Sequence, residues 1–131
     1  MANIVGIDLG TTFSVIAKLD DIGRPEVINV DGSNITPSVV EFTSSNTFDV
    51  GKEAKKALED GISSNIAQEV KRFMGSKEKT YEFFDQKHTP TSISALILKK
   101  LKEATEANYG DIDSAVVTVP VLRLVSLRIQ M

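Results

Sequence analysis

β-branched and other apolar residues recur in three short runs near the start of the chain, at residues 3–9, 13–19 and 26–30. Short polar segments separate these runs: GTT at residues 10–12, and DDIGRP before the third run. Runs of this length, joined by turn residues, predict a meander of three antiparallel strands. The alternation in SVVEFT, just after a proline, predicts another extended segment.

From Gly51 onward the apolar positions follow helical spacing. The segment GKEAKKALEDG predicts a first helix that ends at Gly61. A second helix is predicted to begin at Ser63 or Ser64, either of which can cap it, and to end at Gly75. Its apolar positions are Ile66, Val70, Phe73 and Met74.

The clearest helical pattern opens with Thr89 as N-cap and Pro90 at the first helical position, and ends at Gly110. Its apolar stripe consists of Ile93, Leu96, Ile97, Leu101 and Ala104. Before it, TYEFF predicts a short strand or an edge strand. After it, SAVVTVP is apolar enough to predict a central strand that is covered on both faces.

Composition narrows the class of protein. The 131 residues suffice for one domain with a core, and the content of 41% hydrophobic and 25% charged residues suggests neither disorder nor a membrane span. The net charge of −3 argues against nucleic-acid binding, which needs a basic surface. The absence of cysteine excludes disulfides, thiolate catalysis and cysteine-ligated zinc. The chain runs into NIVGIDL without a signal segment, so we expect a cytoplasmic protein.

The GTT turn is the main candidate for chemistry. Small residues after an apolar strand let main-chain N–H groups approach phosphate oxygens closely. The residue order does not match a P-loop, and the turn opens a strand where a dinucleotide-binding fingerprint requires a helix. A phosphate-binding hairpin remains, with Asp8 placed to hold Mg²⁺ or its waters. From spacing alone, an ordinary β-turn with Asp8 on the surface is an equally good interpretation.

The segment IVGIDLGTTFSVIA resembles the first phosphate motif of the actin-like ATPase superfamily, and specifically that of the seventy-kilodalton heat-shock chaperones of the DnaK type. Further segments that resemble this family follow in the family's order: ITPSVVEF, GKEAKK, VKRFMG, SISALILKKLKEATEANYG and AVVTVP. The resemblance extends from Val5 to Pro120. It implies an α/β protein with the actin-like, ribonuclease H-like ATPase fold. Only lobe I of that fold is expected: a mixed sheet that starts with the three-strand meander, with helices packed on it.

The resemblance also implies a domain organisation. Residues 1–120 are expected to form a partial nucleotide-binding domain, within which residues 38–90 form the smaller outer subdomain. The segment 75–90 is shorter than the family usually has, so this subdomain is expected to be trimmed. Residues 121–131 are an atypical tail.

The resemblance assigns roles to individual residues. It implies that Gly10, Thr11, Thr12 and Phe13 line the β- and γ-phosphates of ATP or ADP, partly through main-chain amides. Asp8 is expected to orient water on Mg²⁺, and Lys71 to reach the γ-phosphate and the attacking water. The expected catalytic residues are therefore Lys71, Asp8 and Thr11. The resemblance further implies that Pro120 relays the nucleotide state to a substrate-binding domain; from its position alone it is a strand terminator.

The function implied by the resemblance is that of an ATP-dependent chaperone, active in the stress response. The complete protein is expected to couple ATP hydrolysis to the binding of unfolded polypeptides, with co-chaperones as partners. The sequence leaves open whether this chain is itself an enzyme, because the second catalytic carboxylate and the second lobe are missing. We expect nucleotide binding by the chain alone to be roughly millimolar or absent, and hydrolysis to be negligible.

The tail departs from the family pattern directly after Pro120. The segment VLRLVS resembles a later strand of the family, but no crossover helix precedes it, and parallel neighbours need a connection of about a dozen residues. The alternation in VLRLVSLRIQM predicts one more strand with an apolar face. This strand is expected to pair elsewhere, to pair with another copy, or to be disordered and prone to aggregation.

Two other functions are compatible with the sequence. One is a small-molecule kinase of the same superfamily, which VKRFMG and AVVTVP disfavour because they resemble the chaperones. The other is a non-catalytic interaction protein that self-associates through the exposed half-cleft and residues 121–131.

Overall fold

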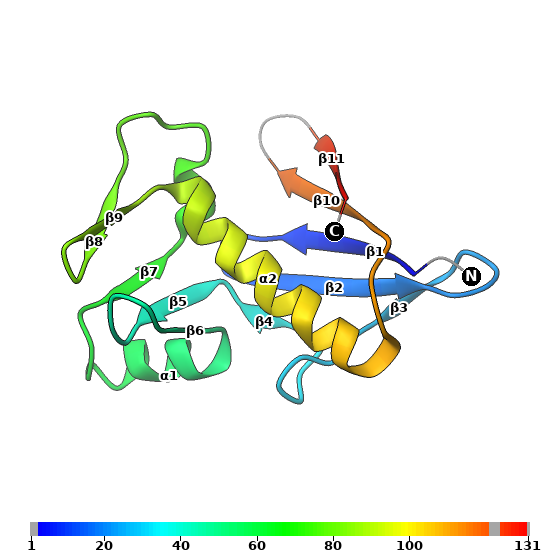
Figure 1. Cartoon of the computed structure of the whole chain (residues 1–131), viewed down its shortest axis with the longest axis horizontal. Helices are drawn as coiled ribbons and strands as arrows, with labels where there is room; N and C mark the ends of the chain where they lie inside the picture. Colours follow the sequence, from blue (N-terminus) through cyan, green and yellow to red (C-terminus); the bar gives the residue numbers. More distant parts are fainter. Residues whose placement is uncertain (1–2, 121–123, 131) are drawn as a thin grey trace.

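The computed structural model describes residues 3–120 and 124–130, and its largest element is a six-stranded mixed sheet (Figure 1). The strand order is β11-β10-β1-β2-β3, and β4 pairs with β2. The strands of this main sheet are β1 (Ile4–Leu9), β2 (Phe13–Leu19), β3 (Pro25–Val27), β4 (Thr36–Pro37), β10 (Ser114–Pro120) and β11 (Leu124–Gln130). β1 and β10 are parallel, and the other neighbours are antiparallel. The predicted three-strand meander is confirmed as β1, β2 and β3.

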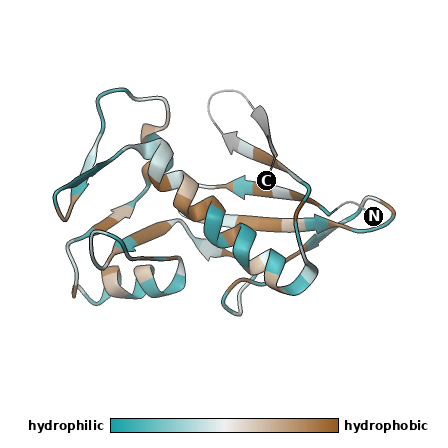
Figure 2. Cartoon of the chain, in the orientation of Figure 1, coloured by the Kyte–Doolittle hydropathy of each residue, from teal (hydrophilic) through white to brown (hydrophobic). Residues whose placement is uncertain are grey.

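One face of the main sheet forms the core with helix α2 (Pro90–Tyr109), which crosses in front of β1 and β2 in Figure 1. Alternate residues of β1 are buried on this face, as the two-residue period of a strand requires. The buried residues of the sheet and of the helix belong to one cluster, and the brown strands and helix stripe in Figure 2 follow it. Its central members are Val5, Ile7, Leu9, Ile16, Ile93, Ile97, Leu101, Ala115 and Val117.

The residues between β4 and α2 form a smaller part with its own short sheets, and its buried apolar residues join the same core cluster. One sheet has the order β6-β5-β7, and β8 and β9 form a two-stranded hairpin. The elements are β5 (Val39–Phe42), β6 (Phe48–Val50), α1 (Lys52–Glu59), β7 (Ile66–Gln68), the 3₁₀ helix η1 (Val70–Phe73), β8 (Tyr81–Phe83) and β9 (Gln86–His88). The strand in SVVEFT, the helix after Gly51 and the short strand in TYEFF are confirmed.

Both predicted ends of α2 are confirmed. The Thr89 side chain accepts a hydrogen bond of 3.1 Å from the Ser92 N–H, and the Ser92 side chain accepts one of 2.9 Å from the Thr89 N–H. This reciprocal capping box satisfies two N–H groups that would otherwise lack partners at the start of the helix. Gly110 ends the helix with φ 80°, a conformation that favours glycine.

The predicted helix between Ser63 and Gly75 is wrong. Residues 66–68 form β7 instead, in which Ala67 pairs with Val40 of β5, and only the four residues of η1 are helical. Glu69, between these two elements, has φ 54°, which interrupts any continuous right-handed helix. Pairing with β5 therefore outweighs a helical spacing that rests on few apolar residues.

The predicted placement of SAVVTVP is partly wrong. It forms β10 and lies between β1 and β11, as expected of a central strand, but it is not covered on both faces, because Val116 is 38% exposed. Residues 124–130 of the tail form β11, antiparallel to β10, with Pro120 opposite Leu124, and the rest of the predicted tail lies outside the described residues. A short connection permits an antiparallel hairpin but no parallel neighbour, which accounts for the direction of β11.

Candidate phosphate-binding site

The turn at residues 10–12 joins β1 to β2 at the end of their ladder, where Leu9 is opposite Ser14. Gly10 has no room for a side chain, because an added Cβ atom would overlap the carbonyl oxygen of Phe13. Any other residue at this position would force the turn open. The glycine therefore permits a tight hairpin with little side-chain bulk above it.

Two serines hold this turn from its buried side. The Ser38 N–H donates to the Thr12 carbonyl at 2.9 Å, and the Ser38 hydroxyl donates to the Gly10 carbonyl at 2.8 Å. The Ser14 and Ser38 hydroxyls lie 2.8 Å apart and are hydrogen-bonded. Both serine side chains are buried. Two carbonyl groups of the turn are thus engaged inside the protein.

The outer side of the turn presents N–H groups. Within the described residues, the amides of Thr11 and Thr12 have no main-chain acceptor. Thr12 is exposed and Thr11 partly exposed. Successive N–H groups without acceptors form an anion-binding concavity, so the turn is chemically suited to phosphate oxygens.

Asp8 and Lys71 are brought together from different parts of the fold. Asp8 lies near the end of β1, exposed on the sheet face opposite to α2, between Val15 and Thr118. Lys71 lies on η1 and is partly buried. Burial lowers the pKa of the Lys71 amine, and the Asp8 carboxylate opposes this shift through its charge. Among the ion pairs of the described residues, none joins these two groups within 4.0 Å.

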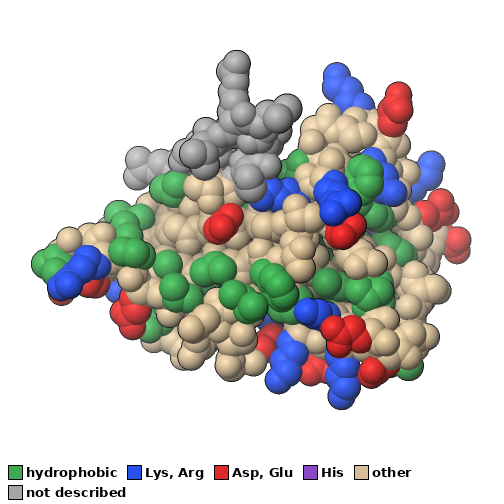
Figure 3. Space-filling view, turned by 180° about the vertical axis from the view of Figure 1, so that it is seen from behind, with side chains coloured by type: hydrophobic (Ala, Val, Ile, Leu, Met, Phe, Trp, Pro, Cys, Tyr) green, Lys and Arg blue, Asp and Glu red, His purple; other side chains and the backbone are tan. Residues whose placement is uncertain are grey.

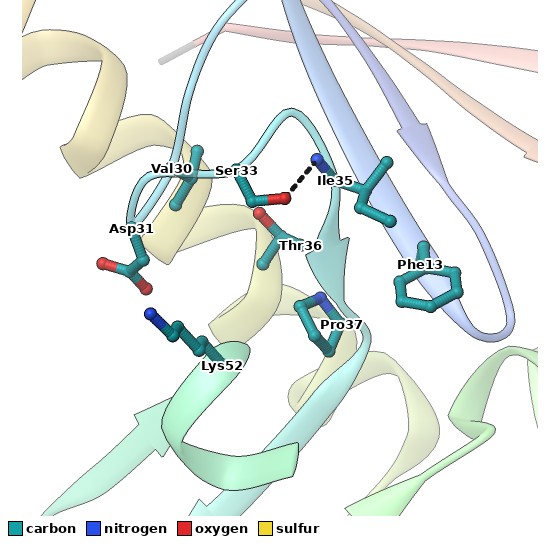
Figure 4. A pocket seen from close by; sticks show the side chains of 8 residues that line it. All are labelled: Phe13, Val30, Asp31, Ser33, Ile35, Thr36, Pro37 and Lys52. Atoms are coloured by element: carbon teal, nitrogen blue, oxygen red, sulfur yellow. Dashed lines mark hydrogen bonds between the residues drawn. The ribbon is translucent and has the colours of Figure 1, made fainter. Parts of the chain in front are cut away.

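The Phe13 ring does not line the cavity that Thr11 and Thr12 line, but lies 4.8 Å below the Lys55 amine, which does. The ring lines a cavity of about 250 Å³ beside Ile35 and Pro37, with Asp31 and Lys52 across the opening (Figure 4). The Ile35 N–H donates to the Ser33 hydroxyl at 3.3 Å in the loop that forms one wall. A contribution of Phe13 to phosphate binding would therefore come from its main chain.

A second, smaller cavity of about 90 Å³ lies directly beside the turn. Its lining includes Thr11 and Thr12 on one side and Lys55 and Glu69 on the other. A pocket that holds a drug-sized ligand measures about 300–1,000 Å³. The cavity at the turn is thus large enough for part of a polyphosphate group and too small for a whole nucleotide.

The structure brings some of the predicted site residues together, but not all of them. The turn, Asp8 and the segment that carries Lys71 converge, since Glu69 lines the cavity beside Thr11. Pro120 is the last residue of β10, and its side chain lies outside the described residues. Sequence reasoning missed Ser14 and Ser38, although each is a hydroxyl residue within an apolar strand pattern, which is a signal for a buried polar contact.

Among the described residues, no group of three or more His, Asp or Glu side chains comes together. None of the helices in residues 3–120 is long and apolar enough to cross a membrane.

Comparison with known proteins identifies relatives. The family described as "Hsp70 protein" matches residues 4–84 and 78–122. The chaperone protein DnaK of Thermotoga neapolitana is 49% identical over 119 residues, which cover 89% of this chain and 20% of the relative. The DnaK proteins of Thermotoga petrophila and Thermotoga maritima are each 48% identical over the same coverage. The chain thus spans about a fifth of the length of these relatives, and it belongs to the Hsp70 family.

Proposed function

We propose that this chain is the phosphate-binding part of the ATPase domain of an ATP-dependent protein-folding chaperone. The observation that carries the proposal is the turn at residues 10–12, in which Ser38 binds the Gly10 and Thr12 carbonyls, whereas the Thr11 and Thr12 N–H groups have no main-chain acceptor among the described residues. Lys71 adds a positive charge near the same place. Fixed N–H groups and an amine are the parts that phosphoryl-transfer enzymes use to hold and stabilise phosphate charge.

The proposed roles follow the chemistry of each group. Gly10, Thr11, Thr12 and the Phe13 main chain would bind the β- and γ-phosphates of ATP or ADP. Lys71 would neutralise charge on the γ-phosphate and hold the attacking water. Mg²⁺, when bound with the nucleotide, would neutralise phosphate charge; its fit here rests on the exposed carboxylate of Asp8. One carboxylate suits Mg²⁺, which keeps most of its waters.

The finer fold assignment is part of the same proposal. Residues 1–120 would be a partial ATPase domain of the actin-like fold, with 38–90 as its outer subdomain. The division is supported by the separate small sheets between β4 and α2. The relay role of Pro120 and a cytoplasmic location stay predictions.

We further propose that the complete protein uses ATP to bind and release unfolded polypeptides with the help of co-chaperones. The printed names of the relatives, chaperone protein DnaK, support this. The chain alone would bind nucleotide weakly, because the cavity at the turn accommodates only part of the ligand. Hydrolysis would be negligible without charged groups on the opposite side of the nucleotide.

A nucleotide titration followed by NMR amide shifts tests this function. MgATP and MgADP are expected to shift the Thr11 and Thr12 amides with millimolar affinity, and MgAMP, which lacks the β- and γ-phosphates, is expected not to. Lys71→Ala should weaken MgATP binding. Lys99→Ala is the matched control, since Lys99 is an exposed lysine of α2 that faces Glu103 at 4.0 Å.

The outcomes separate the hypotheses. Equal shifts from MgAMP and MgATP, or shifts confined to other surfaces, would contradict the proposal. Release of phosphate from MgATP at a family-like rate by the chain alone would contradict its proposed inactivity. The kinase hypothesis finds no support in the comparisons, whose family and named relatives are chaperones.

A second candidate function is self-association, and the uncovered sheet face favours it. On this face Val27, Ala17, Gly6 and Val116 form one row across four adjacent strands. Val27 and Val116 are 46% and 38% exposed, and apolar side chains extend across the middle of the molecule when seen from this side (Figure 3). Exposed apolar patches mark interaction surfaces, and a second copy would bury the side chains that are exposed here.

A further inference from the structure

We infer that Ser38 is the positioning residue of the phosphate turn, and that Ser14 fixes the direction of its hydroxyl. The inference rests on the proposed function, because it states how the turn is kept ready for phosphate. Ser38 lines the small cavity beside the turn, but its hydroxyl is engaged with the Gly10 carbonyl and the Ser14 hydroxyl. Each serine acts through another group. Ser38 acts through the Gly10 and Thr12 carbonyls, and Ser14 acts through the Ser38 hydroxyl.

The direction of the hydrogen bonds follows from counting protons. A carbonyl can only accept, so the Ser38 hydroxyl donates its single proton to the Gly10 oxygen. The bond between the two hydroxyls must then be donated by Ser14. The result is a directed chain, from Ser14 to Ser38 to Gly10, in which each bond strengthens the next.

This chain decides which side of the turn faces outward. Carbonyl oxygens carry partial negative charge and repel phosphate, whereas N–H groups attract it. Ser38 holds the Gly10 carbonyl through its side chain and the Thr12 carbonyl through its main chain. With these two oxygens bound by Ser38, fewer carbonyl groups of the turn are available to repel an incoming anion, and the Thr11 and Thr12 amides still lack main-chain acceptors among the described residues.

Ser38 also lies at the junction of the two parts of the fold. It follows β4 of the main sheet and precedes β5 of the smaller sheet. The next residue, Val39, pairs with Gln68 of β7, which leads directly to η1 and Lys71. One residue therefore fixes the turn and anchors it to the segment that carries the amine.

The burial of this network supports a role beyond packing. Ser14 is fully buried and Ser38 is 4% exposed. A buried hydroxyl is unfavourable unless it is hydrogen-bonded, and an apolar residue at either place would avoid that cost. Among the described residues, the Ser14 and Ser38 hydroxyls have hydrogen-bond partners only within this network.

The test compares Ser38→Ala, the conservative rescue Ser38→Thr and a matched control, Thr105→Val. The Thr105 hydroxyl is buried too and donates to the Leu101 carbonyl at 2.9 Å within α2, far from the turn in the sequence. Ser14→Ala is the second variant if Ser38→Ala does not fold. It leaves the bond to Gly10 in place and removes only the donor behind it.

Two NMR readouts are used on the full chain. The first is the scalar coupling across the hydrogen bond from the Ser38 nitrogen to the Thr12 carbonyl carbon, which needs no ligand. The second is the affinity for magnesium tripolyphosphate, read from the Thr11 and Thr12 amides. Ser38→Ala is expected to weaken the coupling and to reduce the affinity about three- to tenfold, the effect of one lost hydrogen bond. Ser38→Thr should restore both, and Thr105→Val should change neither.

Unchanged coupling and unchanged affinity in Ser38→Ala would overturn the inference. If the unaltered chain gives no shifts with tripolyphosphate, the proposed function fails. The scalar coupling still tests the inference in that case, because it needs no ligand. A wild-type coupling in Ser38→Ala would show that the Ser38 hydroxyl does not position the turn. The two failures are therefore distinguishable.

Discussion

The Asp8 carboxylate on β1 acts on the Lys71 amine on η1: its charge raises the pKa of this amine. Burial lowers the same pKa by more, so the pKa is lowered on balance. The amine is partly withdrawn from water and has no carboxylate within 4.0 Å among the described ion pairs. Its charge is therefore incompletely balanced by the described part of the chain. A polyphosphate group bound at the adjacent turn would balance it.

The first prediction concerns the titration of Lys71. Its pKa lies below the ordinary lysine value of 10.5, so the amine loses its proton, and with it the attraction for phosphate, at a lower pH than a lysine in free solution. Asp8→Asn removes the charge that raises this pKa, so the titration midpoint of Lys71 should fall further. Titration of the ¹³Cε shifts of labelled lysine measures this, with Asp49→Asn as a surface control. A Lys71 midpoint that does not move in Asp8→Asn would show that the two charges do not interact.

The second prediction concerns the tightness of the turn. Gly10→Ala places a methyl group against the Phe13 carbonyl and should lower the free energy of unfolding by about 1–3 kcal/mol, as overpacking does. Gly6→Ala, on β1, is the control, because an added Cβ there meets no atom within 4 Å. Denaturant unfolding of both variants measures the difference. Equal stability of the two variants would mean that the turn has room for a side chain.

The third prediction concerns the start of α2. Thr89→Ala removes one side of the capping box and should lower the free energy of unfolding by about 1 kcal/mol. Thr91→Ala, an exposed position in the first turn of the same helix, should change it by less than about 0.5 kcal/mol. Thermal unfolding followed by circular dichroism compares the two, and a larger loss in Thr91→Ala would contradict the capping role.

The fourth prediction concerns self-association through the uncovered sheet face. Four adjacent strands of about six residues present roughly 400 Å², about half of the roughly 800 Å² per partner in a standard interface. Association should therefore be weak and visible only at high protein concentration in sedimentation velocity. Val116→Lys should abolish it, whereas Ile62→Lys, at a loop position that is 76% exposed, should not. A chain that stays monomeric at every concentration would contradict this function.

The parts of the fold that were predictable from the sequence are those determined by neighbouring residues. The hairpin of β1 and β2 follows from alternating apolar residues around a glycine, and α2 follows from a long stripe between Thr89 and Gly110. The segment 63–75 was mispredicted because its apolar spacing suits a helix locally, while pairing with β5 decides its structure. That pairing partner is distant in the sequence, so no local pattern reveals it.

The candidate site also has features that the sequence predicts and features that it does not. Asp8 and the turn are adjacent in sequence, so the motif itself indicates them. The environment of Lys71 depends on how η1 approaches β1, and the bond between Ser14 and Ser38 joins two separate strands. Tertiary contacts create both features, which is why only the structure makes them visible.

The most direct test of the account is to place the metal that accompanies a nucleotide. Mn²⁺ with ADP, added to the ¹⁵N-labelled chain in place of Mg²⁺, broadens amide signals according to their distance from the ion. The account predicts the strongest broadening at Asp8, Thr11 and Thr12, a weaker effect at Lys71, and none in the β8–β9 hairpin. Broadening centred on the cavity that Asp49 and Glu103 line, with sharp signals from the turn, would contradict it.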